Sequence, residues 1–262
     1  MEITGRTVLL TGATGGIGHA IARALHARGG QLILTGRRRE ILEPLAAEIS
    51  GTALAADLSQ RADVDRLIAE AGHADILVNN AALPASGPLS SFSVDELDRA
   101  LDVNLRAPLV LARHFADAMS ARGAGHMVFV SSLAGMSGQG GASVYSATKF
   151  GLRGFVQGLF DDLAPSGVGT SAVFPGFIRD AGMFADANTE LPRGVGTSSP
   201  EDVAAGVVKA IERNRLEVVV APIGMRVMTA LAAAAPGVSK RFVPGSAKQV
   251  AVDLAAGQRD KR

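Results

Sequence analysis

Short apolar runs, many of them β-branched, alternate along the chain with longer amphipathic stretches. The short runs have the length and composition of strands. They predict strands at residues 7–11, 31–35, 52–57, 75–80, 126–132, 169–174 and 216–221. Strands that are apolar on both faces and alternate with helices are typical of a parallel sheet covered on both sides. The pattern therefore predicts an α/β fold.

Between these runs, apolar residues recur with the period of a helix. In residues 17–29 they place Ile17, Ile21 and Leu25 on one face, and Gly29 ends the segment. We expect further helices at about 39–49, from a capping box at 93–96 to about 121, from about 145 to 163, and from a cap at 199 onward. Because the chain has no linker, repeat or low-complexity tract, we expect one domain over 1–262.

Two regions lack this regularity. Residues 177–198 are rich in Gly, Asp and Asn, and a long connection of this kind is more typical of a functional lid than of a domain boundary. Residues 223–262 form a variable C-terminal segment that contains the alanine-rich run 227–238. That run is too short to span a membrane. It remains open whether the segment covers the pocket, contacts a membrane or forms an interface.

Composition excludes several classes of protein. The chain has 262 residues, 47% of them apolar, which is enough for a substantial core. Its 26 basic and 25 acidic residues give no electrostatic case for nucleic acid. Without cysteine there is no disulfide or thiolate metal site, and the five histidines have no metal-like pairing. No signal peptide is recognisable, and we expect a cytoplasmic protein.

The segment TGATGGIG, at 11–18, joins the first predicted strand to the first predicted helix. Unpaired backbone amides and the dipole at a helix N-terminus favour an anion, and small residues let a pyrophosphate approach the backbone. The alternative is a plain glycine-rich turn. The position between strand and helix favours nucleotide binding by Gly12, Thr14, Gly16, Ile17 and Gly18.

The end of the second strand bears on the choice of nucleotide. A site that prefers NAD places Asp or Glu there to hold the ribose 2′-hydroxyl, whereas this chain has Gly36 followed by three arginines. Guanidinium groups bind a 2′-phosphate that a carboxylate would repel. The sequence favours NADP(H) over NAD(H), with Arg37 as the first candidate and Arg38 as the second. The alternative is that these arginines only solvate the next helix.

Polar residues end several of the predicted strands, where ligands bind in open parallel sheets. Asp57 can accept a hydrogen bond from an adenine amino group, or it can cap the next helix. Asn79 and Asn80 end an apolar strand, where caps and backbone clamps are the plain explanation. Ser131 and Ser132 end the strand at 126–132.

Tyr145 is the only tyrosine of the chain and lies thirteen residues after Ser132. Lys149 follows at i+4, so the two side chains share one helix face. A nearby ammonium lowers the pKa of a phenol from its usual value of about 10. Tyrosine would then move a proton while a nicotinamide moves a hydride. Taken alone, such a pair is more often a surface aromatic packed on a lysine stem.

Together, TGATGGIG, NNA, VSS, YSATK and PG, in this order and spacing, resemble the short-chain dehydrogenase/reductase family in its compact-subunit form over about residues 5–222. The resemblance implies a single Rossmann-type domain with a doubly wound parallel sheet of seven strands. It implies that Ser132 orients the substrate, that Tyr145 is the acid–base, and that Lys149 lowers the tyrosine pKa and holds the nicotinamide ribose. Asn104 would complete a proton relay through water.

Cofactor contacts are also carried over by the resemblance. They fall on the glycine loop, on Tyr145 and Lys149, and on Asp57, Leu58, Asn79, Ala81, Pro175, Gly176 and Ile178. This chain departs from the family pattern at Ala82, where NNAG reads NNAA, and at Asp180, where threonine is common. A carboxylate at 180 would repel phosphate, so the cofactor contact from that loop is in question.

We therefore expect an oxidoreductase that interconverts a carbonyl and an alcohol with NADP(H), acting as a reductase on an apolar ketone or aldehyde. Phe177, Met183 and Phe184 favour the apolar substrate. The alternatives are a non-catalytic nucleotide sensor, and an epimerase or dehydratase that uses the same Tyr–Lys pair. The helix at 146–163 is apolar on more than one face, as in family members that form homodimers or homotetramers there. We expect no metal, no nucleic acid and no spanning segment, with peripheral membrane contact left open.

Overall fold

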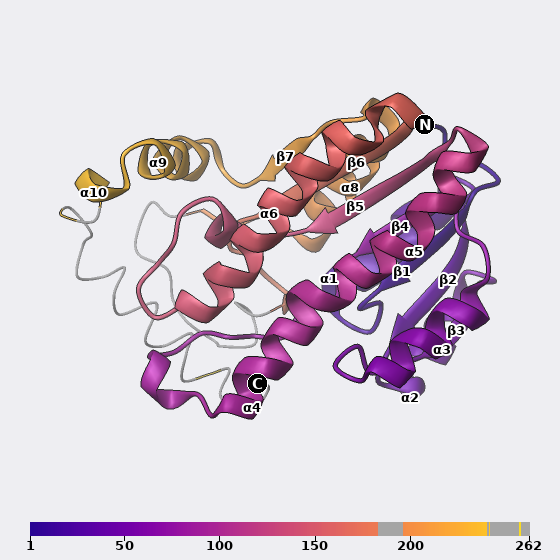
Figure 1. The fold of residues 1–262 in the computed structure, drawn as a ribbon, viewed down its shortest axis with the longest axis horizontal. Coiled ribbons are helices and arrows are strands. Elements are labelled where there is room, and N and C mark those ends of the chain that lie inside the picture. Colours follow the sequence, from indigo (N-terminus) through magenta and orange to yellow (C-terminus); the bar gives the residue numbers. More distant parts are fainter. Residues whose placement is uncertain (183–195, 240, 242–256, 258–262) are drawn as a thin grey trace.

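Seven parallel strands form one sheet in the order β3-β2-β1-β4-β5-β6-β7 (Figure 1). The computed structural model describes residues 1–182, 196–239, 241 and 257, so most of the predicted lid and most of the C-terminal segment lie outside it. The strands are β1 Thr7–Thr11, β2 Gln31–Gly36, β3 Thr52–Ala55, β4 Ile76–Asn79, β5 Gly125–Val130, β6 Val168–Pro175 and β7 Glu217–Val220. The predicted doubly wound parallel sheet is confirmed.

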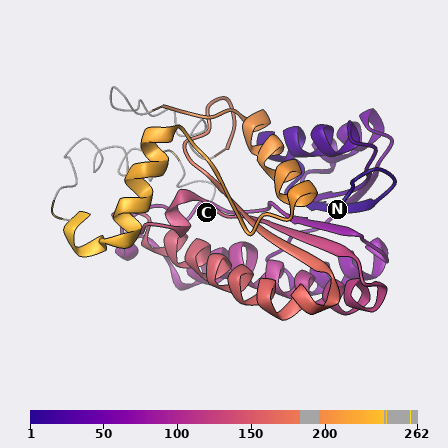
Figure 2. The ribbon, with the colours of Figure 1, turned by 90° about the horizontal axis from the view of Figure 1, so that it is seen from above.

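Helices cover both faces of the sheet (Figure 2). One face packs against α1 Gly16–His26, α2 Arg39–Glu48 and α8 Pro200–Arg213, and the other against α3 Arg61–Ala71, α5 Ala107–Arg122 and α6 Ser143–Leu163. Successive strand side chains point to opposite faces. Accordingly Leu9 and Leu10, both fully buried, enter different core clusters. Burial on both faces explains why the strands read as continuous apolar runs.

The helix expected from 93 to about 121 is present and runs to Arg122, with one irregular turn in its middle. It begins as α4 Val94–Leu101 with the predicted capping box between Ser93 and Glu96, passes through a π-turn at Asp102–Arg106, and continues as α5. The cause is Pro108, which has no N–H to donate to the carbonyl of Asn104. The Ala107 N–H donates instead to the Asp102 carbonyl.

The third strand is also shorter than predicted. The chain leaves the sheet after Ala55 and turns at Asp57, whose carboxylate accepts hydrogen bonds from the backbone N–H and the hydroxyl of Ser59, at 3.0 and 2.8 Å. The remaining elements are the short 3₁₀ turns η1 Leu89–Ser91, η3 Leu133–Gly135 and η4 Ala164–Ser166, and the helices α9 Ile223–Ala234 and α10 Pro236–Ser239.

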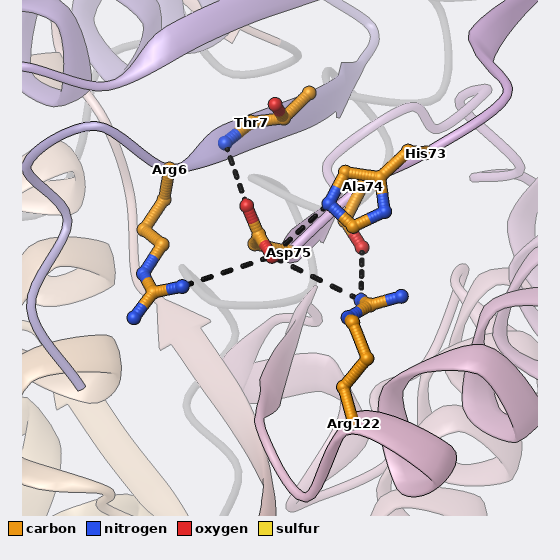
Figure 3. A network of polar contacts seen from close by, with 6 residues as sticks. All are labelled: Arg6, Thr7, His73, Ala74, Asp75 and Arg122. Atoms are coloured by element: carbon orange, nitrogen blue, oxygen red, sulfur yellow. Dashed lines mark hydrogen bonds and ion pairs between the residues drawn. The ribbon is translucent and has the colours of Figure 1, made fainter.

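The amino edge of the sheet is held by a polar network around Asp75 (Figure 3). Its carboxylate accepts from the Thr7 backbone N–H at 3.0 Å and contacts His73 Nε2 at 3.1 Å. Arg6 and Arg122 each approach it to 3.9 Å. Because the Asp75 side chain is only 14% exposed, these partners satisfy a charge that would otherwise be costly to bury.

Among the helices that the structure describes, none is both long and apolar enough to cross a lipid bilayer.

Candidate active site

A cavity of about 990 Å³ opens at the carboxyl edge of the sheet. Strand order reverses between β1 and β4, and ligands in open α/β sheets bind at such a switch point. Most of the predicted site residues line this cavity: Gly12, Thr14, Gly16, Ile17, Gly18, Arg37, Arg38, Asp57, Leu58, Ala81, Ser132, Tyr145, Lys149, Pro175, Gly176 and Ile178. Asn79 and Asn104 are not among the lining residues.

The glycine loop forms one wall, and its backbone is packed too closely for side chains. Gly12 has a φ of +68°, and a Cβ there would lie 2.6 Å from Cα of Ala81. A Cβ on Gly16 would lie 2.5 Å from Cβ of Ala181. The loop therefore exposes its backbone at the N-terminus of α1, as an anion site requires.

Asn80, rather than Asn79, clamps this loop to β4. Its side-chain amide donates to the carbonyls of Thr11 and Gly12, both at 3.1 Å. The Thr11 hydroxyl accepts in return from the backbone N–H groups of Asn80 and Ala81. Asn79 is 3% exposed and does not line the cavity, so its predicted cofactor contact stays a prediction. Its alternation along β4 places it on the same side as Leu77, away from the cavity.

Ser132, Tyr145 and Lys149 come together at the end of β5. Ser132 follows β5 and its hydroxyl hydrogen-bonds the Tyr145 phenol. Tyr145 and Lys149 lie in the first two turns of α6, and the Lys149 Nζ lies 5.6 Å from the centre of the tyrosine ring. Nζ also donates to the Val130 carbonyl at 2.9 Å, which holds the lysine at the strand end.

Burial dominates the electrostatics of this group. It raises the pKa of Tyr145 to about 12, and the hydrogen bond with Ser132 lowers that pKa only in part. Burial also lowers the pKa of Lys149 to about 8, since the side chain is 1% exposed. In this structure burial outweighs the Ser132 hydrogen bond, so the phenol pKa lies above its usual value, and the lowering by Lys149 stays a prediction. At neutral pH the phenol carries its proton.

Asn104 does not line the cavity and is fully buried. Its side chain pairs with the Leu83 backbone: Oδ1 accepts from the N–H at 2.6 Å, and Nδ2 donates to the carbonyl at 2.9 Å. Nδ2 also lies 3.5 Å from the Thr148 hydroxyl, which donates to the Tyr145 carbonyl. The π-turn thus places Asn104 against the helix that carries the tyrosine, while its backbone carbonyl is released from α-helical bonding by Pro108.

Two arginines stand at the end of β2, where Gly36 leaves room for Thr14. A Cβ at residue 36 would lie 2.7 Å from Cγ2 of Thr14. Arg38 donates to the Thr14 carbonyl at 2.7 Å, and Arg37 lines the cavity beside it. An acidic side chain at residue 36 would collide with the threonine.

The segment that follows β6 packs against the glycine loop. Asp180 lines the cavity with φ +64°, and its neighbours Ala181 and Gly182 contact Gly16 and Ile17. The Asp180 carboxylate is 76% exposed and lies 3.5 Å from the Arg179 guanidinium. The residue that departs from the family pattern therefore lies at the anion-binding end of the cavity.

Two contributions were missed from sequence: the Thr11 hydroxyl, and Ser131, which donates to the Lys149 carbonyl at 3.1 Å. Their polar side chains at strand ends were the available signal, but only the fold shows which way each points. The backbone clamp was expected from Asn79 or Asn80, and the structure assigns it to Asn80.

Comparisons with known proteins place this geometry in a family. The model of the short chain dehydrogenase family matches residues 6–192. The chain is 35% identical over 227 residues to ketoacyl reductase HetN from Nostoc sp., covering 83% of this chain and 79% of that protein. It is 33% identical over 217 residues to the 3-oxoacyl-acyl-carrier-protein reductase FabG from Rickettsia bellii, covering 79% and 89%. A short-chain dehydrogenase from Sphingobium yanoikuyae, solved in complex with NADPH, matches with a TM-score of 0.78 at 28% identity, covering 92% and 97%.

The chain belongs to the short-chain dehydrogenase family. It is an oxidoreductase of the kind that uses a nicotinamide cofactor. The residues present fit that group, because the glycine loop leaves a cradle that a Cβ at Gly12 or Gly16 would fill.

Proposed function

We propose that this protein reduces an apolar ketone or aldehyde to the alcohol, with NADPH as the preferred reductant. The observation that supports this most is the convergence of Ser132, Tyr145 and Lys149 on the cavity that also contains the glycine loop. A nucleotide sensor has no need of that group of side chains. The relatives named as reductases support the same direction of reaction.

The proposal gives each of these side chains a role. The Ser132 hydroxyl holds the substrate oxygen, and the Tyr145 phenol donates its proton to that oxygen as the alcohol forms. A bound nicotinamide supplies the hydride for the carbonyl carbon. Lys149, whose pKa is about 8, remains mostly protonated at neutral pH and stabilises the phenolate that results. Asn104 acts as a positioning residue. Its side chain contacts Leu83 and Thr148 and so holds the helix that carries Tyr145.

The preference for NADP(H) rests on residues 14 and 36–38. Arg37 and Arg38 offer guanidinium groups to a 2′-phosphate. The contact between Gly36 and Thr14 leaves no room for the acidic side chain that an NAD site uses to hold the ribose hydroxyl. The same proposal includes cofactor-binding roles for the other predicted residues that line the cavity: Asp57, Leu58, Ala81, Pro175, Gly176 and Ile178.

An apolar substrate is supported by Leu83, Phe177 and Met225, three apolar residues that line the cavity. Met183 and Phe184, which also suggested this preference, lie outside the described residues. For assembly we propose a homodimer or homotetramer through α6, where Phe150 leaves a 42% exposed aromatic side chain.

A substrate panel tests the function. Ketones and aldehydes of graded chain length should be reduced with NADPH, with kcat/KM rising with apolar length and falling when NADH replaces NADPH. No reduction of any member, with NADPH still bound tightly, would favour a nucleotide sensor instead. Equal rates with the two cofactors would refute the NADP(H) preference alone.

A further inference from the structure

Helix α9 has an outer face of exposed apolar side chains. In the described part of the chain nine large apolar residues are exposed, and five of them lie in α9 and α10: Ile223, Val227, Met228, Leu231 and Val238. Their exposed fractions range from 52% to 73%. Single exposed apolar residues are ordinary, but a concentration of them on one element marks an interaction surface.

One side of α9 is exposed, and the opposite side lines the cavity. Ile223, Val227 and Leu231 recur every four residues and form one stripe along the helix. Met225 and Thr229 project from the opposite side and line the cavity. A Cβ on Gly176 would lie 2.9 Å from the Met225 sulfur, so this inner side packs on the turn after β6. Figures 1 and 2 show α9 and α10 standing apart from the helices that cover the sheet.

The charge around this surface indicates its partner. Residues 218–252 contain no Asp or Glu but four basic residues: Arg226, Lys240, Arg241 and Lys248. The whole chain is nearly neutral, with 26 basic and 25 acidic residues, so this stretch is a local excess of positive charge. Arg226 and Arg241 are both exposed. An apolar stripe beside basic residues is the pattern of a helix that lies in the interface of an anionic membrane.

A second copy of the chain fits this surface less well. A two-fold symmetric contact places the same patch on both subunits. Pairing through α9 would therefore place the Arg226 of both subunits in one contact, with no acid in residues 218–252 to compensate. An anionic lipid surface satisfies the apolar and the basic side chains together.

We propose that α9 and α10 dock this protein on an anionic lipid surface. The stripe of Ile223, Val227 and Leu231 enters the boundary between headgroups and acyl chains, and Arg226 and Arg241 lie among the phosphates. Because the inner side of the same helix lines the cavity, docking places the cavity mouth beside the lipid. That last consequence rests on the proposed function, since it concerns delivery of an apolar substrate.

Sedimentation with lipid vesicles tests the docking. The full chain should pellet with vesicles of mixed phosphatidylcholine and phosphatidylglycerol, and much less with phosphatidylcholine alone or at high salt. The double variant Val227→Ser and Leu231→Ser should lose about tenfold or more of this binding, because each exposed side chain gives up its burial in lipid. The matched control is Leu89→Ser with Val94→Ser, which removes apolar residues that are 62% and 71% exposed elsewhere. It should bind like the parent.

Absence of binding to the mixed vesicles, or equal binding by the parent and the α9 variant, would overturn the proposal. Self-association of the parent that the α9 variant abolishes, without vesicle binding, would assign the face to a second copy. Reduction of a water-soluble ketone by NADPH, measured without vesicles, should be the same in both double variants, since none of the four positions lines the cavity. Loss of vesicle binding with retained reduction therefore tests docking separately from the proposed function.

Discussion

The two edges of the sheet carry similar polar side chains in different surroundings. At the amino edge, Asp75 is satisfied by Thr7, His73 and two arginines. His126 nearby is 1% exposed, and its Nε2 lies 2.9 Å from the Ser171 hydroxyl. At the carboxyl edge, the side chains of Tyr145, Ser132 and Arg37 instead line a cavity. Polar groups at the amino edge hold strands together, whereas those at the carboxyl edge are directed at a ligand.

This comparison predicts that substitutions at the carboxyl edge change activity with little change in stability, and that substitutions at the amino edge do the reverse.

After Tyr145, the largest expected effect is at Lys149. Lys149→Met should lower kcat/KM by about 10²- to 10³-fold, in the range typical of lost acid–base assistance. The free energy of unfolding of this variant should equal or exceed the parent's, because a buried ammonium is removed. Since burial lowers the lysine pKa to about 8, reduction by the parent should decline as pH rises through about 8, where the ammonium loses its proton. The variant should lack this decline, and a profile like the parent's would contradict the role.

At the amino edge, acid should destabilise the fold through His126. Burial lowers the pKa of His126 to about 3, against about 6.5 in the unfolded chain. The unfolded state therefore binds more protons below pH 6.5, and stability present above that pH is lost as pH falls toward 3. Between pH 7 and 5 the loss should be about 2 kcal/mol.

Urea unfolding of His126→Gln at pH 7 and pH 5 measures this contribution, with the exposed His114→Gln as control. The His126 variant should show the smaller change with pH, and its kcat at pH 7 should match the parent's. An unchanged pH dependence of stability would show that His126 is not the responsible group.

Arg37 separates the two nicotinamide cofactors. Arg37→Ala should raise the KM for NADPH by about tenfold or more, the loss expected for a charge-assisted hydrogen bond, and change the KM for NADH little. Arg39→Ala is the matched control, because Arg39 belongs to the same run but does not line the cavity. Equal effects on the two cofactors would refute the assignment.

The smallest effect concerns Asp180. Asparagine is the suitable replacement, since it tolerates the φ of +64°, which the β-branched threonine of the family pattern adopts poorly. Asp180→Asn should lower the Kd for NADPH by about threefold at low salt, with the difference shrinking at high salt. Asp161→Asn, at an exposed site on α6, controls for net charge. Weaker NADPH binding by the Asp180 variant would show that the Asp180 carboxylate favours cofactor binding and does not oppose it.

Sequence patterns predicted the sheet and the glycine loop, because strand and helix periods and a glycine-rich turn are local features, and the family resemblance supplied most of the other predicted residues that line the cavity. They did not predict the π-turn, since the effect of Pro108 depends on a helix that continues on both sides of it. Asn79 and Asn80 are adjacent and alike in sequence, and only the strand alternation decides which one clamps the loop. The raised pKa of Tyr145 was not predicted, because spacing reveals the lysine but not the burial of the phenol.

The central claim is that the Tyr145 phenol donates the proton in carbonyl reduction, and Tyr145→Phe tests it most directly because the ring is kept and only the hydroxyl is lost. Reduction of the best ketone by bound NADPH should be measured in a single turnover, together with the Kd for NADPH. The expected result is a rate about 10³-fold or more below the parent's, with a Kd for NADPH within about twofold of it, because the phosphate-binding loop is untouched. A rate close to the parent's would contradict the account.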